Sequence, residues 1–187
     1  MQPKAFSMGA RIEHKQADID LAQYGAAPDG LPAADYSLNV HFDDGESAYT
    51  FCMCPGGEVI AAASEEGGVV TNGMSRSSRD GENANAALLV TLTPDDFPYD
   101  GVLGGMYWQR EIEKKAYEIG HDYKACAQTV GDFLARTPST NAGSVTPSYK
   151  PGVHWGDIRS VLPEKITCVM ERAIPELGKK LKGFDAP

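Results

Sequence analysis

The stretch FCMCPGGEVIAAASEEGGVVTNGMS, from Phe51 to Ser75, decides how the rest of the sequence is read. It holds two cysteines one residue apart, a Pro-Gly-Gly turn and two apolar runs separated by Glu65-Glu66-Gly67-Gly68. Because glycine supplies the positive φ of tight turns, the two runs predict a β-hairpin. The chain continues as RSSRDGENANAALLV to Val90, where small, amide and arginine side chains precede an apolar strand. This combination indicates backbone brought close to a ligand.

Short apolar or alternating runs on both sides of this hairpin are typical of strands. A second hairpin is expected around Asp43-Asp44-Gly45. Between the first two strands we expect a short helix over residues 16–24 and then a loop over 25–32. The predicted strands cover residues 5–13, 36–42, 48–54, 58–63, 68–74 and 87–93.

The apolar pattern changes to a helical period in the second half. Apolar residues from Trp108 to Ile119 recur at helical spacing and predict an amphipathic helix. Two further helices are expected over 124–136 and 163–181, and Pro175 should kink or divide the second of these. The segment 137–152, rich in Pro, Ser, Thr and Gly, is expected to be a long loop.

These patterns together predict an α+β fold. We expect an antiparallel β-sheet or small barrel in a β-rich subdomain, residues 1–97, packed with a helical subdomain, residues 98–187. A chain of 187 residues with 42% hydrophobic residues is long and apolar enough to bury a core. We expect the two subdomains to form one module.

Charge and cysteine usage exclude several classes of function. A net charge of -9 argues against a protein that binds nucleic acid through its phosphates. No apolar run reaches the roughly 18 residues that a membrane span needs, and no export signal is evident, so no membrane association is expected. The four cysteines are too few and too uneven for the disulfide framework of a secreted domain, which favours a cytoplasmic location.

Cys52 and Cys54 allow two interpretations. In a strand, residues two apart point to the same face, so the thiols would lie side by side as a redox pair. Their Cα atoms would then be about 6.5 to 7 Å apart, at the upper end of disulfide geometry, so closure would need a bent backbone. Alternatively, both are small buried residues that pack the interior.

Metal and nucleotide motifs are absent from the sequence. No CxxC pair occurs, and His14, His41, His121 and His154 show no ligand spacing, so no metal site is predicted. There is no GxGxxG after a strand, no GxxxxGK[ST], no GxSxG and no HExxH. The chain therefore looks chemically incomplete by itself.

Three groups of residues remain as candidates for contact with a ligand. Pro55-Gly56-Gly57 and Asn72-Gly73-Met74-Ser75 are either plain turns or places where a flat ligand meets the backbone. Arg79, Asn83 and Asn85 supply donors and acceptors that either hold a polar substrate or fix the loop onto a neighbouring domain.

The blocks FCMCPGG, SEEG, NGMS, RDGENANAALLV, DFLAR, SYKPGV, LPEKI and KGFD occur in this order along the chain. In this respect the sequence resembles the FAD-dependent dehydrogenases often called NAD(FAD)-utilizing dehydrogenases, from about Gly9 to Asp185. One block departs from the family pattern, because Cys126 in KACAQ stands where a proline is usual, whereas Gln128 keeps the match.

The resemblance implies a larger flavoprotein. In that family a two-part FAD domain of Rossmann type surrounds an inserted region, and this chain resembles the inserted region alone. It would be the substrate or cap domain that closes over the flavin, with the FAD-binding domain of the same polypeptide as its partner and a small molecule as substrate. FAD would be held mainly by segments absent from this chain, NAD(P) is possible, and this fragment alone would be inactive.

The resemblance also assigns residues: Pro55, Gly56 and Gly57, and the block Asn72, Gly73, Met74 and Ser75, would approach the flavin or the substrate cavity. We further expect Cys54, and less so Cys52, to be the thiols with a catalytic role. Arg79 would attract an anionic substrate group, and Asn83 and Asn85 would also bind the substrate. Two other classes stay open: a non-catalytic module that binds a ligand or partner without flavin, and a thiol redox protein that uses both cysteines.

Overall fold

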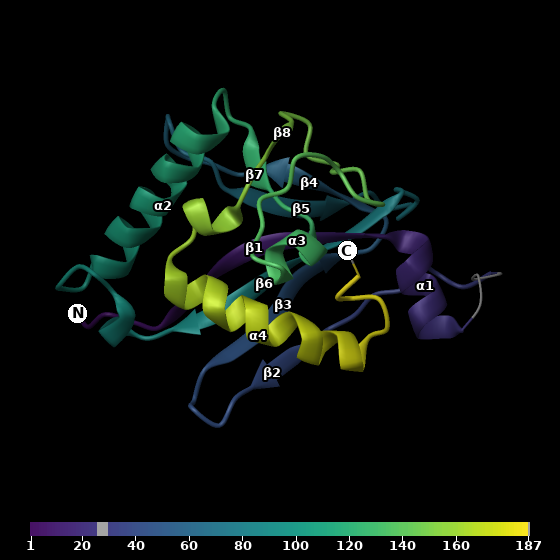
Figure 1. Ribbon diagram of the computed structural model, residues 1–187, viewed down its shortest axis with the longest axis horizontal. Coiled ribbons are helices and arrows are strands. Elements are labelled where there is room, and N and C mark those ends of the chain that lie inside the picture. The colour runs from purple at the N-terminus through teal and green to yellow at the C-terminus, as the bar shows by residue number, and fades with distance from the viewer. Residues whose placement is uncertain (26–29, 187) are drawn as a thin grey trace.

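A four-stranded antiparallel sheet forms the centre of the computed structural model, which describes residues 1–25 and 30–186 (Figure 1). The strand order is β1-β6-β3-β2, so β1 and β2 are the edges. The strands are β1 (Phe6–Lys15), β2 (Asn39–His41), β3 (Ser47–Cys54) and β6 (Asn83–Leu92). The predicted antiparallel sheet is confirmed. Helix α1 (Gln16–Tyr24) follows β1 as expected, and residues 26–29 of the loop predicted after it lie outside the described residues.

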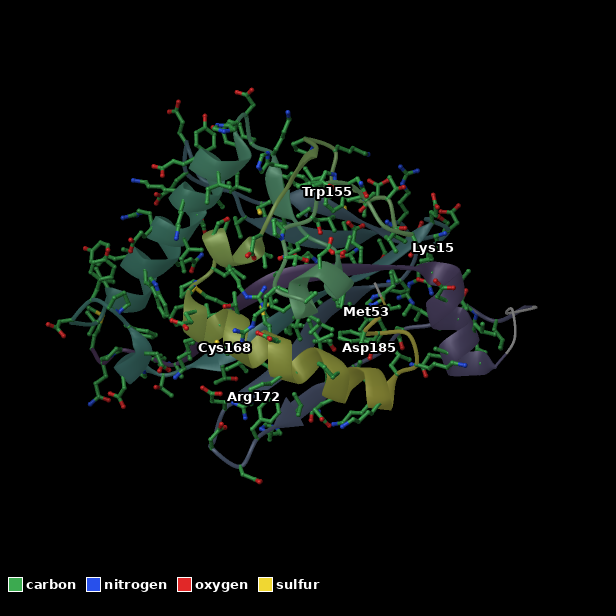
Figure 2. The ribbon with its side chains drawn as sticks, viewed as in Figure 1. Lys15, Met53, Trp155, Cys168, Arg172 and Asp185 are labelled. Carbon is green, nitrogen blue, oxygen red and sulfur yellow. The ribbon has the colours of Figure 1, made fainter. Side chains whose placement is uncertain are left out.

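One face of this sheet is covered by the C-terminal helix α4 (Glu164–Lys180) (Figure 1). Alternate residues of β6, such as Leu88 and Val90, are 1% exposed, as a strand with one face in the core requires. Helix α4 continues through Pro175, so the prediction that this proline divides the helix is wrong. Figure 2 shows Arg172 on the side of α4 toward β2, where its guanidinium contacts Asp44 and Glu46 beside the β2–β3 turn.

The opposite face of the sheet is covered at one end by the second hairpin, β4 (Gly57–Ala61) and β5 (Thr71–Ser75). Both predicted hairpins are therefore confirmed, since β2 also pairs antiparallel with β3. The consequence for function is that outward-facing side chains of β1 and β6 are enclosed rather than solvated.

The second half builds a layer beside the edge strand β1. Its long helix, α2 (Gly104–Gly120), confirms the amphipathic helix read from the sequence. The remaining elements are short: η1 (Pro94–Asp96), β7 (Ala125–Ala127), α3 (Val130–Leu134), β8 (Val153–Trp155) and η2 (Ile158–Ser160).

The helix predicted over 124–136 is wrong in its first half. Residues Ala125–Ala127 form a strand that pairs in parallel with β8, and helix α3 begins only after Thr129, whose side chain accepts a hydrogen bond from the Asp132 amide. Pairing with a strand 28 positions away in sequence overrides the local helical pattern.

The buried core draws on both halves of the chain. Leu88 and Val90 of β6 belong to the same apolar cluster as Phe133 of α3 and Leu177 of α4. The chain end is also held, because Phe184 is 0% exposed. No helix in the described ranges is long and apolar enough to cross a membrane.

Candidate functional site

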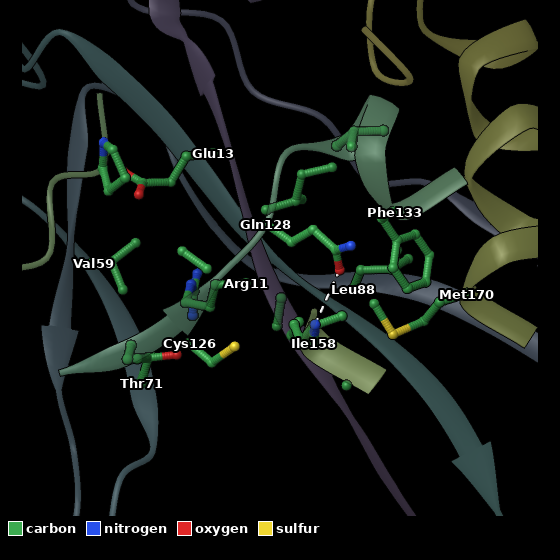
Figure 3. Close-up of a pocket in the computed structure, with 18 of the residues that line it drawn as sticks. Arg11, Glu13, Val59, Thr71, Leu88, Cys126, Gln128, Phe133, Ile158 and Met170 are labelled. Carbon is green, nitrogen blue, oxygen red and sulfur yellow. Dashed lines mark hydrogen bonds between the residues drawn. The ribbon is translucent and has the colours of Figure 1, made fainter. Parts of the chain in front are cut away.

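A cavity of about 460 Å³ lies along the edge strand β1 (Figure 3). It is enclosed by β1, the β4–β5 hairpin, helix α2 and the β7–β8 layer, because each of these elements contributes to its walls. The walls are mostly apolar, with contributions such as Ile112 and Ala116 from α2. Polar groups come chiefly from β1 and from the segment after β7; those shown in Figure 3 are Arg11, Glu13, Thr71, Cys126 and Gln128.

Arg11 is one of two half-buried cations that line this cavity, the other being Lys15. Its Nη1 donates to the Asn72 side-chain oxygen at 3.2 Å, and its Nη2 donates to the Cys52 carbonyl at 2.6 Å. Its Nε is buried without an acceptor, and no ion pair is found for Arg11 among residues 1–25 and 30–186. Burial lowers the pKa of the guanidinium, and the neighbouring Cys54 and, more weakly, Glu13 act in the opposite direction. A guanidinium is charged at neutral pH, and the oxygens that accept its hydrogen bonds are neutral.

Glu13 lies two residues further along the same face of β1, but its carboxylate is fully engaged. It accepts hydrogen bonds from the Asn83 side chain at 3.0 Å and from the Ser148 hydroxyl at 2.5 Å. Its two oxygens also accept from the Ser148 amide, each at 3.2 Å. Glu13 therefore holds the loop between α3 and β8 against the sheet.

Gln128 and Cys126 complete the polar part of the wall without offering a reactive group. The Gln128 side chain donates to the Thr137 carbonyl at 2.7 Å and accepts from the Ile158 amide at 3.0 Å (Figure 3). Burial raises the pKa of the Cys126 thiol, with nearby Asp157 adding to the effect. The thiol is protonated at neutral pH and is a poor nucleophile.

None of the residues assigned from the sequence lines the cavity, but several meet directly behind its wall. Asn72 and the Cys52 carbonyl bind Arg11, the Cys54 sulfur lies 3.9 Å from Nη2, and Asn83 binds Glu13. These predicted residues are therefore neighbours of Arg11 and Glu13, two cavity-lining residues of β1 that the sequence did not single out.

The glycines of the CPGG and NGMS blocks are required by packing within the chain. A Cβ on Gly56, whose φ is +50°, would lie 2.0 Å from the Arg79 carbonyl oxygen. A Cβ on Gly57 would lie 2.7 Å from the Met74 carbonyl oxygen, and one on Gly73 would lie 2.3 Å from the Asn85 Oδ1 atom. Ser75 ties the two blocks together, because its hydroxyl donates to the Pro55 carbonyl at 2.7 Å. Their close backbone approach is to other parts of this chain, and their approach to a flavin stays a prediction.

The two cysteines lie on a bent segment rather than a regular strand. A bulge interrupts the pairing of β3 with β6 between Phe51 and Cys54, and Cys52 has a φ of 45°. Cys52 is exposed and Cys54 half-buried, so the interpretation of both as buried packing residues is wrong. Both thiols are free, and Cys54 donates to the Cys52 carbonyl at 3.3 Å.

The remaining predicted substrate residues differ in their surroundings. Arg79 is exposed and lies outside the cavity. Asn85 is 0% exposed, and neither its Oδ1 nor its Nδ2 atom has a hydrogen-bond partner. The Asn85 amide lies beside Gly73 and outside the cavity lining, whereas Arg11, whose Nε also lacks an acceptor, lines the cavity.

Among the described residues, the β1–α1 junction is not a phosphate site of the Rossmann type. Such a site has a glycine-rich turn between a strand and a helix N-terminus, and β1 runs directly from Lys15 into α1. The glycines at the start of α2 meet other parts of the chain, since a Cβ on Gly104 would lie 2.2 Å from the Tyr99 carbonyl oxygen. Within the same described ranges, no group of three or more His, Cys, Asp or Glu side chains could hold a metal ion.

The fold and the cavity define an α+β domain with room for a small molecule beside an open sheet edge. Residues 5–187 match the family described as FAD-dependent protein, C-terminal domain-like, and the chain belongs to this family. An uncharacterized protein from Clostridium beijerinckii is 45% identical over 188 residues. That alignment covers 98% of this chain and 35% of the relative, so the chain spans about a third of the relative's length.

Proposed function

We propose that this chain is the substrate-binding or cap domain of an FAD-dependent oxidoreductase of the dehydrogenase type. The observation that carries the proposal is the cavity, in a chain whose family is named for FAD dependence. A volume of about 460 Å³ with mostly apolar walls and few polar groups is typical of small-molecule sites. The cavity would hold the substrate.

The proposal divides FAD binding and substrate binding between two parts of a longer polypeptide. The proposal assigns FAD mainly to segments outside this chain, with NAD(P) as a possible electron carrier, and the β1–α1 junction without a glycine-rich turn supports this. The FAD-binding domain of the same polypeptide would be the partner, and the threefold greater length of the Clostridium relative supports this. The flavin would supply the redox chemistry, whereas this domain would bind and orient the substrate and exclude water.

Within this proposal, the residues assigned from the family fall into two groups. Asn72 and Met74 are exposed on the hairpin, so they are the ones available to meet a flavin-binding domain. Gly56, Gly57 and Gly73 would act indirectly, by allowing the hairpin to pack closely against Arg11 and Arg79.

The flavin content of the chain alone and of the complete polypeptide tests the division of roles. We expect FAD to bind the complete polypeptide and not the isolated chain. Ala127→Phe places an aromatic ring in the cavity. We expect this variant to keep the FAD content of the complete polypeptide unchanged. We also expect it to abolish uptake of the neutral apolar dye phenylnaphthylamine. The matched control is Ala63→Phe on the exposed β4–β5 connection, which should change neither property.

Two results would contradict the proposal. Tight FAD binding by the isolated chain would show that the dinucleotide site lies within it. Dye uptake that survives Ala127→Phe would show that the cavity is not the site of small-molecule binding.

A further inference from the structure

We propose that the cavity takes a carboxylate with an apolar body, and that Arg11 is the residue that recognises the charged end. This inference rests on the proposed function, because it names the substrate class of the same cavity. It starts from the unbalanced charge of Arg11, which the proposed function does not use.

Arg11 is a partly buried cation without an anionic partner. Its described hydrogen bonds go to the neutral oxygens of Asn72 and Cys52 and to the Cys54 sulfur. A guanidinium has five donors, so these three bonds leave donor capacity unused. Burying an unpaired charge is costly, so an incoming anion would supply compensation that the protein does not provide by itself.

Three acidic residues also line the cavity: Asp18 is exposed, and the other two are occupied elsewhere. Glu13 accepts from Asn83 and Ser148, and Glu113 accepts from the Gln109 side chain at 2.7 Å. Neither carboxylate forms an ion pair with Arg11. The guanidinium therefore remains available to a ligand carboxylate, for which its planar fork is well suited.

The apolar walls of the cavity determine which ligand body can accompany the carboxylate. Walls contributed by residues such as Ile112, Ala116 and Val161 cannot satisfy polar groups on a ligand, so they favour an apolar body. Trp155 of β8, labelled in Figure 2, adds an aromatic surface to the same wall. One charged end and one apolar body together describe an amphipathic carboxylate.

Two fluorescent dyes with the same aromatic body separate charge recognition from apolar binding. Anilinonaphthalene sulfonate carries an anionic group, and phenylnaphthylamine lacks it. In the present chain, Arg11→Gln should weaken binding of the sulfonate dye about tenfold or more, as loss of a charge-assisted hydrogen bond predicts, and leave the neutral dye unchanged. Arg11→Lys keeps the charge and should restore part of the affinity.

Arg76→Gln is the matched control, because Arg76 is exposed and outside the cavity. It removes the same charge from the chain and should affect neither dye. Competition then addresses the natural class of ligand: octanoate should displace the sulfonate dye from the wild-type chain, and octanol should not.

The outcomes separate this inference from the proposed function. Equal loss of both dyes in Arg11→Gln, or equal weakening by Arg76→Gln, would overturn recognition by Arg11 and leave the cavity as a binding site. Displacement by octanol as effective as by octanoate would do the same. Failure of both dyes to bind the wild-type chain would overturn the proposed function together with this inference.

Discussion

At the scale of single residues, Gly73 controls how the hairpin lies over Arg11. A Cβ at this position would lie 2.3 Å from the Asn85 Oδ1 atom and 2.4 Å from the Arg11 Nη2 atom. Asn85 is 0% exposed and has no free space to move into, so Arg11 or the hairpin must shift. Gly73 is therefore a condition for the position of Arg11, and its contact with a ligand stays a prediction.

We predict that Gly73→Ala lowers the free energy of unfolding by about 1–3 kcal/mol, the usual cost of overpacking. Urea denaturation followed by circular dichroism measures this. Gly120→Ala is the control, since a Cβ there would meet nothing closer than 3.8 Å and alanine favours the helix. A Gly73→Ala variant as stable as the wild type would show that the hairpin does not press on Arg11.

At the scale of elements, Glu171 joins helix α4 to two segments of the second half. Its carboxylate accepts from Arg136 at 3.0 Å and from Arg159 at 3.1 Å, and its side chain is 22% exposed. The Arg159 guanidinium also lies 4.1 Å from the centre of the Phe133 ring. These contacts fix α3 and η2, which line the cavity, to the helix that covers the sheet.

We predict that Glu171→Gln lowers the free energy of unfolding by about 1–2 kcal/mol, because a carboxylate shared by two arginines is a small network. Glu176→Gln on the same helix removes an exposed pair with Lys179 and should cost less than about 0.5 kcal/mol. Hydrogen bonding from Arg136 holds the pKa of Glu171 below its ordinary value of 4.5. The stabilisation is therefore complete above that pH and lost as the pH falls through the folded-state pKa. Urea denaturation at neutral and acid pH measures both effects, and an equal cost for the two variants would contradict the network.

Turn chemistry made some elements predictable, and tertiary pairing made others unpredictable. Both hairpins follow from glycine-rich connections between apolar runs, which carry their own local signal. Strand β7 has three residues and a partner far along the chain, so nothing local distinguishes it from a helix. Helix α4 survives Pro175 because Ile174 and Leu177, on either side, are held in the core.

Dependence on tertiary contacts also explains why the sequence did not predict a role for Arg11 and Glu13. In the run ARIEH, the charged residues alternate with apolar ones, as they do on any strand with one solvated face. Only the hairpin and the loop before β8, which fold over that face, turn it into a cavity wall. The signal that could have identified Arg11 and Glu13 is a pair of charged residues on a strand face that elements further along the chain cover.

At the scale of the whole molecule, the division into residues 1–97 and 98–187 stays a prediction, and the core gives it a direct test. Leu88 of β6 and Leu177 of α4 are 1% and 0% exposed and belong to one apolar cluster. Both tryptophans, Trp108 and Trp155, lie in the second half, so their fluorescence reports unfolding of that half.

We predict that Leu88→Ala lowers the free energy of unfolding by about 2–5 kcal/mol and shifts the tryptophan transition as much as the circular dichroism transition. The reason is that a cavity opened in β6 removes contacts from the cluster that α4 shares, although the mutated residue lies in the first half. Leu177→Ala should have the same effect from the other side, and Leu31→Ala, 53% exposed, should have little. The contrary result would be an early dichroism change in Leu88→Ala while the tryptophan transition kept its midpoint. In that case residues 1–97 would unfold as an independent domain. The cavity between the two halves would then open while residues 98–187 were still folded.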